Sequence, residues 1–269
     1  MPKDKLTIPD FMRLKKEGRK ITMLTAYDYP TALMVEEAGL DMILVGDSLG
    51  MTVLGLESTI PVTMEDMLHH TKAVTRAVRN TFVVADLPFM AYNISREQAI
   101  ANCGILIKEG GADAVKLEGG NPWVVETVRA VVEAGIPVMA HLGLTPQTAT
   151  QLGGYRVQGK DSDDARRITG QAEALAEAGA FSLVLECVPA SLGAEITKAL
   201  LIPTIGIGAG PDCDGQVLVF HDLVGLFEKF VPKFVKRYAN VREIIVHAMA
   251  EYAEEVRTGA FPDAQHSFK

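Results

Sequence analysis

The sequence predicts a single closed (β/α)8 barrel, an α/β fold in which helices surround eight parallel strands. Eight short runs rich in β-branched residues alternate with longer stretches of helical periodicity along the 269 residues. Four helical stretches end in Glu-Ala-Gly or Glu-Gly-Gly, which is typical of the turn from a helix into a strand. Charged residues gather at the ends of the strand runs, where α/β barrels carry their active sites.

The expected strands are apolar up to their last one or two residues. They cover residues 21–25, 42–46, 82–86, 114–118, 138–141, 183–186, 204–207 and 217–220. An open, doubly wound sheet is the alternative arrangement of such alternating units.

The expected helices have recognisable starts and stops. They cover residues 30–38, 64–79, 96–109, 123–133, 163–178, 190–200 and 241–256, and an extra helix at 6–17 is expected to plug the N-terminal mouth of the barrel. Thr63 and Ser95 are suitable N-caps, with Asp66 completing a capping box after Thr63. No linker rich in Pro, Gly or Ser divides the chain, so residues 1–269 are expected to form one domain.

Composition excludes several classes of protein. Hydrophobic residues make up 48% of the chain and charged residues 22%, which is globular rather than disordered. A net charge of −8 argues against nucleic acid or an anionic membrane as the main partner. Cys103, Cys187 and Cys213 have no metal-binding spacing and are expected to be free thiols. The chain has no apolar run of membrane-spanning length and no signal-peptide pattern, so a cytoplasmic location is expected.

Polar residues at the strand ends form the candidate site. They are Asp47, Ser48, Asp86, Lys116, Glu118, His141 and Glu186. Lys116 and Glu118 lie two residues apart in one strand, so both side chains point to the same side, and the barrel interior is the expected one. His141 is expected either to support the chemistry or to be a hydrogen-bonded core histidine.

Three of these residues, Asp47, Asp86 and Glu118, are carboxylates expected at one mouth of the barrel. Oxygen ligands of this kind suit a hard cation, and Mg²⁺ in particular. The alternative is that each acid caps a helix or pairs with an arginine, and a scaffold barrel of that kind would need no ligand.

The motifs that carry these residues resemble one family from end to end. They are TAYDY at 25–29, VGDSLGM at 45–51, PVT at 61–63, ADLPFM at 85–90, VKLEGG at 115–120, HLGLTPQ at 141–147, GGYRVQG at 153–159, LECVP at 185–189, IGIGAG at 205–210, DGQVLVFHD at 214–222 and HSF at 266–268. With these motifs the chain resembles the 3-methyl-2-oxobutanoate (ketopantoate) hydroxymethyltransferase family.

The resemblance implies a barrel of the phosphoenolpyruvate/pyruvate superfamily. It implies Mg²⁺ held by Asp47, Asp86 and Glu118, and a 2-oxo acid bound by Asp47, Ser48, Asp86 and Lys116. It also implies Glu186 as proton acceptor and 5,10-methylenetetrahydrofolate as the one-carbon donor in pantothenate synthesis. A cytoplasmic homodecamer, built as a pentamer of dimers, is the implied assembly.

Two other functions fit a barrel with these residues. One is a carbon–carbon lyase of the same superfamily that cleaves a 2-oxo or hydroxy diacid. Such lyases resemble one another in a KKCGH-type loop, and here GGYRVQG occupies the comparable stretch. The other is a barrel that binds a 2-oxo acid or folate without catalysis, which the presence of Lys116 and Glu186 disfavours.

Overall fold

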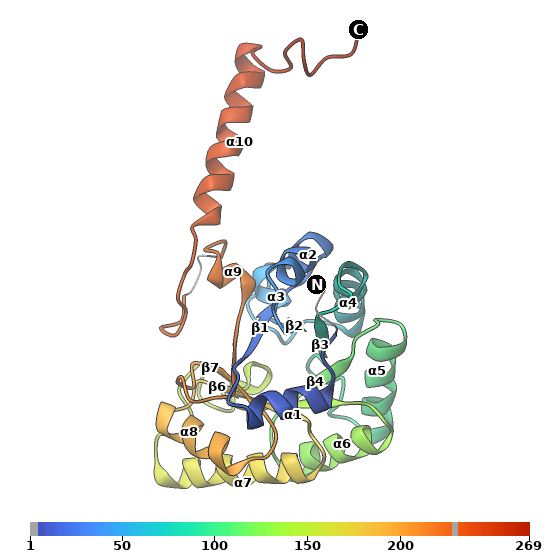
Figure 1. Cartoon of the computed structure of the whole chain (residues 1–269), viewed down its shortest axis with the longest axis vertical. Helices are drawn as coiled ribbons and strands as arrows, with labels where there is room; N and C mark the ends of the chain where they lie inside the picture. The colour runs from blue at the N-terminus through green and yellow to red at the C-terminus, as the bar shows by residue number, and fades with distance from the viewer. Residues whose placement is uncertain (1–4, 228–230) are drawn as a thin grey trace. The chain divides into compact units, whose positions relative to one another are not determined.

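Eight parallel strands close into a barrel in the computed structural model, which describes residues 5–227 and 231–269 (Figure 1). The strands are β1 (Ile21–Thr25), β2 (Met42–Val45), β3 (Phe82–Asp86), β4 (Ala114–Glu118), β5 (Val138–Gly143), β6 (Ser182–Glu186), β7 (Thr204–Ile207) and β8 (Gly215–Leu218). Each strand pairs with the next, and β8 pairs with β1 to close the ring. The predicted barrel is confirmed, and the open doubly wound sheet is wrong.

The helices between the strands form the outer layer of this barrel (Figure 1). They are α2 (Tyr29–Glu37), α4 (Met64–Ala77), α5 (Arg96–Lys108), α6 (Pro122–Glu133), α7 (Ser162–Glu177) and α8 (Ala190–Ala199). Thr63 and Ser95 are N-caps, as predicted. The Thr63 side chain accepts a hydrogen bond from the Asp66 backbone amide, and the Ser95 side chain accepts one from the Gln98 backbone amide. Two short helices after strands, α3 (Leu49–Thr52) and η1 (Pro146–Thr148), have too few residues for a periodic pattern and were not predicted.

The eighth strand begins two residues earlier than predicted, at Gly215. Gly215 pairs with Ile21 of β1 and with Ile205 of β7. A Cβ atom at Gly215 would lie 2.5 Å from the carbonyl oxygen of Ile21, so only a glycine fits between these two strands. Glycine is rare inside strands, so the sequence pattern placed the start of this strand too late.

The chain divides into two compact units, Met1–Val219 and Phe220–Lys269. The first contains the barrel, and the second contains α9 (Phe220–Leu223) and α10 (Val241–Thr258). The expectation that residues 1–269 form one domain therefore stays a prediction. Among the described residues, none of the helices has the length and apolar content that a membrane span requires.

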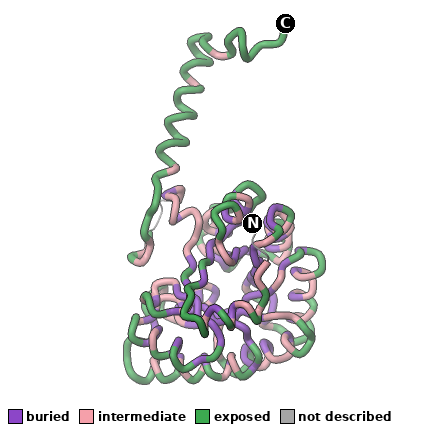
Figure 2. The backbone as a smooth tube through the Cα atoms, in the orientation of Figure 1, coloured by how far each residue is buried: buried purple, intermediate pink, exposed green. Residues whose placement is uncertain are grey.

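Helix α1 (Ile8–Lys16) closes the N-terminal mouth of the barrel, as predicted. Its Phe11 and Leu14 are buried in the same apolar cluster as residues of the strands. The ring of Phe11 meets that of Phe82 edge to face, with 5.2 Å between the ring centres. Lys15 Nζ binds Asp214 Oδ2 at 2.7 Å, which ties the helix to the start of β8. Buried residues, which include most of those in the strands, are purple in Figure 2.

The turns that end α6 and α7 offer a matched test of this architecture. Gly135 and Gly179 both have left-handed backbones, with φ of +88° and +97°. A Cβ atom at Gly135 would meet open space, whereas one at Gly179 would lie 2.8 Å from Val132 Cγ1.

We expect Gly135→Ala to lower the free energy of unfolding by about 1–2 kcal/mol, from backbone strain alone. Gly179→Ala should lower it by about 1–3 kcal/mol more, because the new methyl group also overlaps Val132. Denaturant unfolding of the two variants measures the difference. Equal losses would show that the contact with Val132 relaxes freely.

Candidate active site

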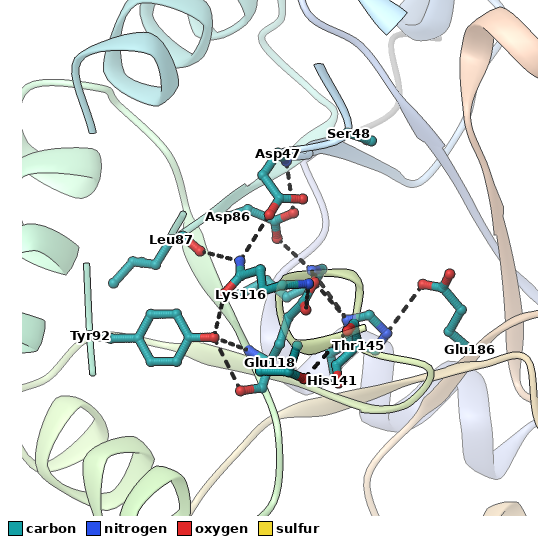
Figure 3. A network of polar contacts seen from close by, with 12 residues as sticks. Asp47, Ser48, Asp86, Leu87, Tyr92, Lys116, Glu118, His141, Thr145 and Glu186 are labelled. Carbon is teal, nitrogen blue, oxygen red and sulfur yellow. Dashed lines mark hydrogen bonds and ion pairs between the residues drawn. The ribbon is translucent and has the colours of Figure 1, made fainter. Parts of the chain in front are cut away.

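The barrel interior changes from apolar to charged along β4. Ala114 belongs to the apolar core cluster, and Lys116 and Glu118 follow it on the same side of the strand. Lys116 pairs in register with Asp86 of β3, and Glu118 with His141 of β5. The prediction that Lys116 and Glu118 point inward is confirmed by their contacts with these residues (Figure 3).

Lys116 is the central cation of this site. Its Nζ lies 2.8 Å from Asp86 Oδ1 and 3.6 Å from Glu118 Oε1. Burial lowers the pKa of Lys116, but the charges of Asp86, Glu118 and Asp47 together raise it well above its ordinary value. Lys116 therefore stays charged. Its ion-pair partners Asp86 and Glu118 are buried, with no more than 5% of either residue exposed.

His141 links two acids across the barrel mouth. Its Nδ1 lies 3.3 Å from Glu118 Oε1, and its Nε2 lies 3.3 Å from Glu186 Oε2 (Figure 3). Burial and Lys116 lower the pKa of His141, but the charge of Glu118 and hydrogen bonds to both acids raise it to about 9. The raised pKa favours the protonated imidazole at neutral pH, which lies between the two carboxylates, and Nδ1 also lies 3.5 Å from Lys116 Nζ.

Asp47 and Ser48 follow β2 and complete the set of predicted residues. The Asp47 amide donates to Asp86 Oδ2 at 3.1 Å, and the Ser48 hydroxyl lies 2.8 Å from that of Tyr27. Burial, together with the charges of Glu118 and Asp86, raises the pKa of Asp47 well above its ordinary value. Asp47 thus lies where a proton or a cation would be stabilised.

A cation suits the charge balance of this site. Asp47, Asp86 and Glu118 are buried acids; Lys116 contacts Asp86 and Glu118, and His141 contacts Glu118. Within the part of the chain that the structure describes, no three His, Cys, Asp or Glu side chains are arranged to hold a metal by themselves. The Lys116 ammonium lies against two of the acids. Mg²⁺ needs only one or two direct carboxylates, because it keeps several waters.

Two polar residues that sequence reasoning missed complete the network. Gln147, in η1, donates two hydrogen bonds to acids. Its side-chain Nε2 donates to Asp47 Oδ2 at 2.9 Å, and its backbone amide donates to Glu118 Oε2 at 3.2 Å. Tyr92 donates to Gln147 Oε1 at 2.7 Å. Both residues are neutral, so the pattern of charged residues at strand ends does not indicate them. Gln147 does lie within the HLGLTPQ motif.

Gly143, the last residue of β5, sets the position of the segment that leads into η1. Gly143 pairs with Glu186 and has a φ of +94°. A Cβ atom there would lie 2.1 Å from the carbonyl oxygen of Glu186, so the backbone of β5 approaches β6 as only glycine allows. The chain can then turn into η1 beside the acids.

Several solved structures have a similar fold. Phosphoenolpyruvate phosphomutase from Streptomyces platensis subsp. rosaceus aligns with a TM-score of 0.63 and 17% identity, covering 94% of this chain and 88% of that one. Phosphonopyruvate hydrolase in complex with oxalate and Mg²⁺ aligns with a TM-score of 0.62 and 15% identity, covering 97% and 93%. A 2,3-dimethylmalate lyase, described as a member of the PEP mutase/isocitrate lyase superfamily, aligns at 0.59 with 16% identity, covering 97% and 91%. At such low identity these likenesses establish the fold.

Sequence comparison is more specific. The chain is 63% identical over 267 residues to the 3-methyl-2-oxobutanoate hydroxymethyltransferase of Moorella thermoacetica, covering 99% of both chains. It is 56% identical over 265 residues to the enzyme of that name from Carboxydothermus hydrogenoformans, covering 98% of this chain and 96% of the other. Residues 5–264 match the family model of ketopantoate hydroxymethyltransferase. The chain therefore belongs to the ketopantoate hydroxymethyltransferase family.

Proposed function

We propose that this enzyme transfers a hydroxymethyl group from 5,10-methylenetetrahydrofolate to 3-methyl-2-oxobutanoate, forming 2-dehydropantoate for pantothenate synthesis. The observation that carries the proposal is the 63% identity, over nearly the whole chain, to a relative with that transferase name. The network of Lys116, His141 and four acids, of which Glu186 is partly exposed, supports it, because this network can bind an anion and accept a proton.

The substrate carboxylate would bind at Lys116. This ammonium is a point charge held between two acids, so its position is set before the substrate arrives. Ser48, Asp47 and Asp86 would complete the substrate contacts. Ser48 is held at the mouth by Tyr27, and Gly46 leaves it room, since a Cβ atom there would lie 2.8 Å from Ser48 Oγ.

Glu186 would accept the proton from C3 of the substrate. Its carboxylate meets the charged His141 imidazole, which fixes the position of one oxygen and leaves the other for the proton. When the C3–H bond breaks, its electron pair forms the enolate. The enolate carbon then bonds to the one-carbon unit, whose bonds to the two folate nitrogens break, and one water molecule supplies the hydroxyl oxygen. The C3 proton and one proton of that water end on the two nitrogens, so tetrahydrofolate is the second product.

Asp47, Asp86 and Glu118 would hold Mg²⁺. The bound ion would supply positive charge beside the keto oxygen of the substrate and so make the proton at C3 more acidic. The surplus of buried carboxylates over cations supports such a site. From the family likeness we also propose a cytoplasmic homodecamer, a pentamer of dimers, in which residues 1–269 act as one catalytic domain.

The purified protein should form 2-dehydropantoate when it is supplied with the 2-oxo acid and the folate donor, and chelation of divalent cations should abolish this activity. Restoring Mg²⁺ should restore the rate, which product chromatography measures. Release of pyruvate or glyoxylate from a diacid, with no 2-dehydropantoate formed, would favour the lyase alternative instead.

Lys116→Met should raise the KM for the 2-oxo acid roughly ten- to one-hundred-fold, because a charged hydrogen bond is worth about 1.5–3 kcal/mol. The variant keeps the length of the side chain but leaves two buried acids without their ammonium. Circular dichroism therefore has to establish that it folds. A folded variant with an unaltered KM would mean that another group holds the substrate carboxylate.

Glu186→Gln should slow hydrogen–deuterium exchange at C3 of the substrate by about 10²–10⁴-fold, since the amide cannot accept the proton. Nuclear magnetic resonance in deuterated buffer measures this exchange without the folate donor. Mg²⁺ affinity serves as the control and should stay unchanged, because Glu186 is outside the proposed ligand set. Exchange at the unmutated rate would assign proton abstraction to another residue.

A further inference from the structure

Gln147 is a neutral residue that contacts three separate segments of the site. It is only 2% exposed. Its Nε2 donates to Asp47 Oδ2 and to the carbonyl oxygen of Leu87, each at 2.9 Å. Its backbone amide donates to Glu118 Oε2 at 3.2 Å. One residue therefore connects the ends of β2, β3 and β4.

The partners of the Gln147 side-chain amide fix which way it points. The Tyr92 hydroxyl lies 2.7 Å from Gln147 Oε1 and accepts a hydrogen bond from the Glu118 amide at 3.3 Å. The single hydroxyl proton has two acceptors within reach, Gln147 Oε1 at 2.7 Å and the Glu118 carbonyl oxygen at 3.2 Å, and the contact to Gln147 is the shorter. If the Gln147 amide were reversed, its oxygen would face two acceptors, Asp47 Oδ2 and the Leu87 carbonyl. The observed orientation is therefore the only one that pairs donors with acceptors.

We propose that Gln147 is a positioning residue that orients the Asp47 and Glu118 carboxylates for a cation, and that Tyr92 acts through it. This inference rests on the proposed function, in which those two acids hold Mg²⁺. Because Gln147 occupies Oδ2 of Asp47, Oδ1 is the oxygen that remains for the ion. Its backbone contact holds Glu118 Oε2, while Oε1 faces Lys116 and His141, so the orientation of this carboxylate is set from both sides. Partners that hydrogen-bond metal ligands restrict them to the binding orientation.

The test compares Mg²⁺ binding to the whole protein and to Gln147→Met. Methionine has a similar length but neither donates nor accepts at the amide positions, and the backbone contact to Glu118 is kept. We expect the Kd for Mg²⁺ alone, measured by calorimetry, to rise about 10- to 100-fold. The matched control is Gln98→Met, because Gln98 Oε1 is a buried amide oxygen without a hydrogen-bond partner. This control should leave the Kd unchanged.

Tyr92→Phe supplies the second variant, and it leaves every Gln147 donor in place. It should raise the Kd for Mg²⁺ by a smaller factor than Gln147→Met. In the Gln147→Met background it should raise the Kd by less than it does alone, because only the Tyr92 contacts with the Glu118 backbone then remain to be lost. Additive effects of the two substitutions would overturn the role of Tyr92.

The outcomes separate this inference from the function on which it rests. A folded Gln147→Met with the unmutated Kd would overturn the inference alone. If Gln147→Met does not fold, an unchanged Kd in Tyr92→Phe would overturn it instead. Failure of the unmutated protein to bind Mg²⁺ would overturn both the inference and the proposed metal site. A purely structural role for Gln147 would lower the unfolding midpoint without moving the Kd.

Discussion

The ion pairs of the buried Lys116 ammonium are the interaction on which the rest of the site depends. Removing an ammonium or a carboxylate from water costs several kcal/mol, and only close partners of opposite charge offset that cost. Lys116 is close enough to Asp86 and Glu118 to serve both. Without it, the two acids would face each other with like charge in a site from which water is largely excluded.

The barrel tolerates this cluster because the charges are confined to one end of it. The other end is filled by an apolar cluster and is closed by Phe11 and Leu14 of α1. No polar partners are needed there. At the charged end, the segments that follow the strands supply the partners, and Gln147 and Tyr92 are two of them. The loops therefore make it possible to bury acids that the strands alone could not satisfy.

His141 gives the site its second cation and joins its two halves. One ring nitrogen faces Glu118 on the side of the proposed cation, and the other faces Glu186 on the side of the proposed base. Its raised pKa keeps both contacts charge-assisted at neutral pH. The ring is buried and in contact with Glu118 and Glu186, and whether His141 supports the chemistry or is a core histidine stays a prediction.

The sequence by itself determined the barrel, the direction of Lys116 and Glu118 and the strand ends at which the acids lie. These features follow from short-range rules, because side chains alternate along a strand and the ends of parallel strands meet at one mouth. These rules did not predict the start of β8. Gly215 is required there because β1 lies close to it, and strand propensity does not favour glycine. Only the tertiary structure decided which polar groups contact the same carboxylate. Gln147 and Tyr92 carry no charge and lie 55 residues apart, so nothing local marks their contact, which depends on the fold bringing η1 against the segment after β3.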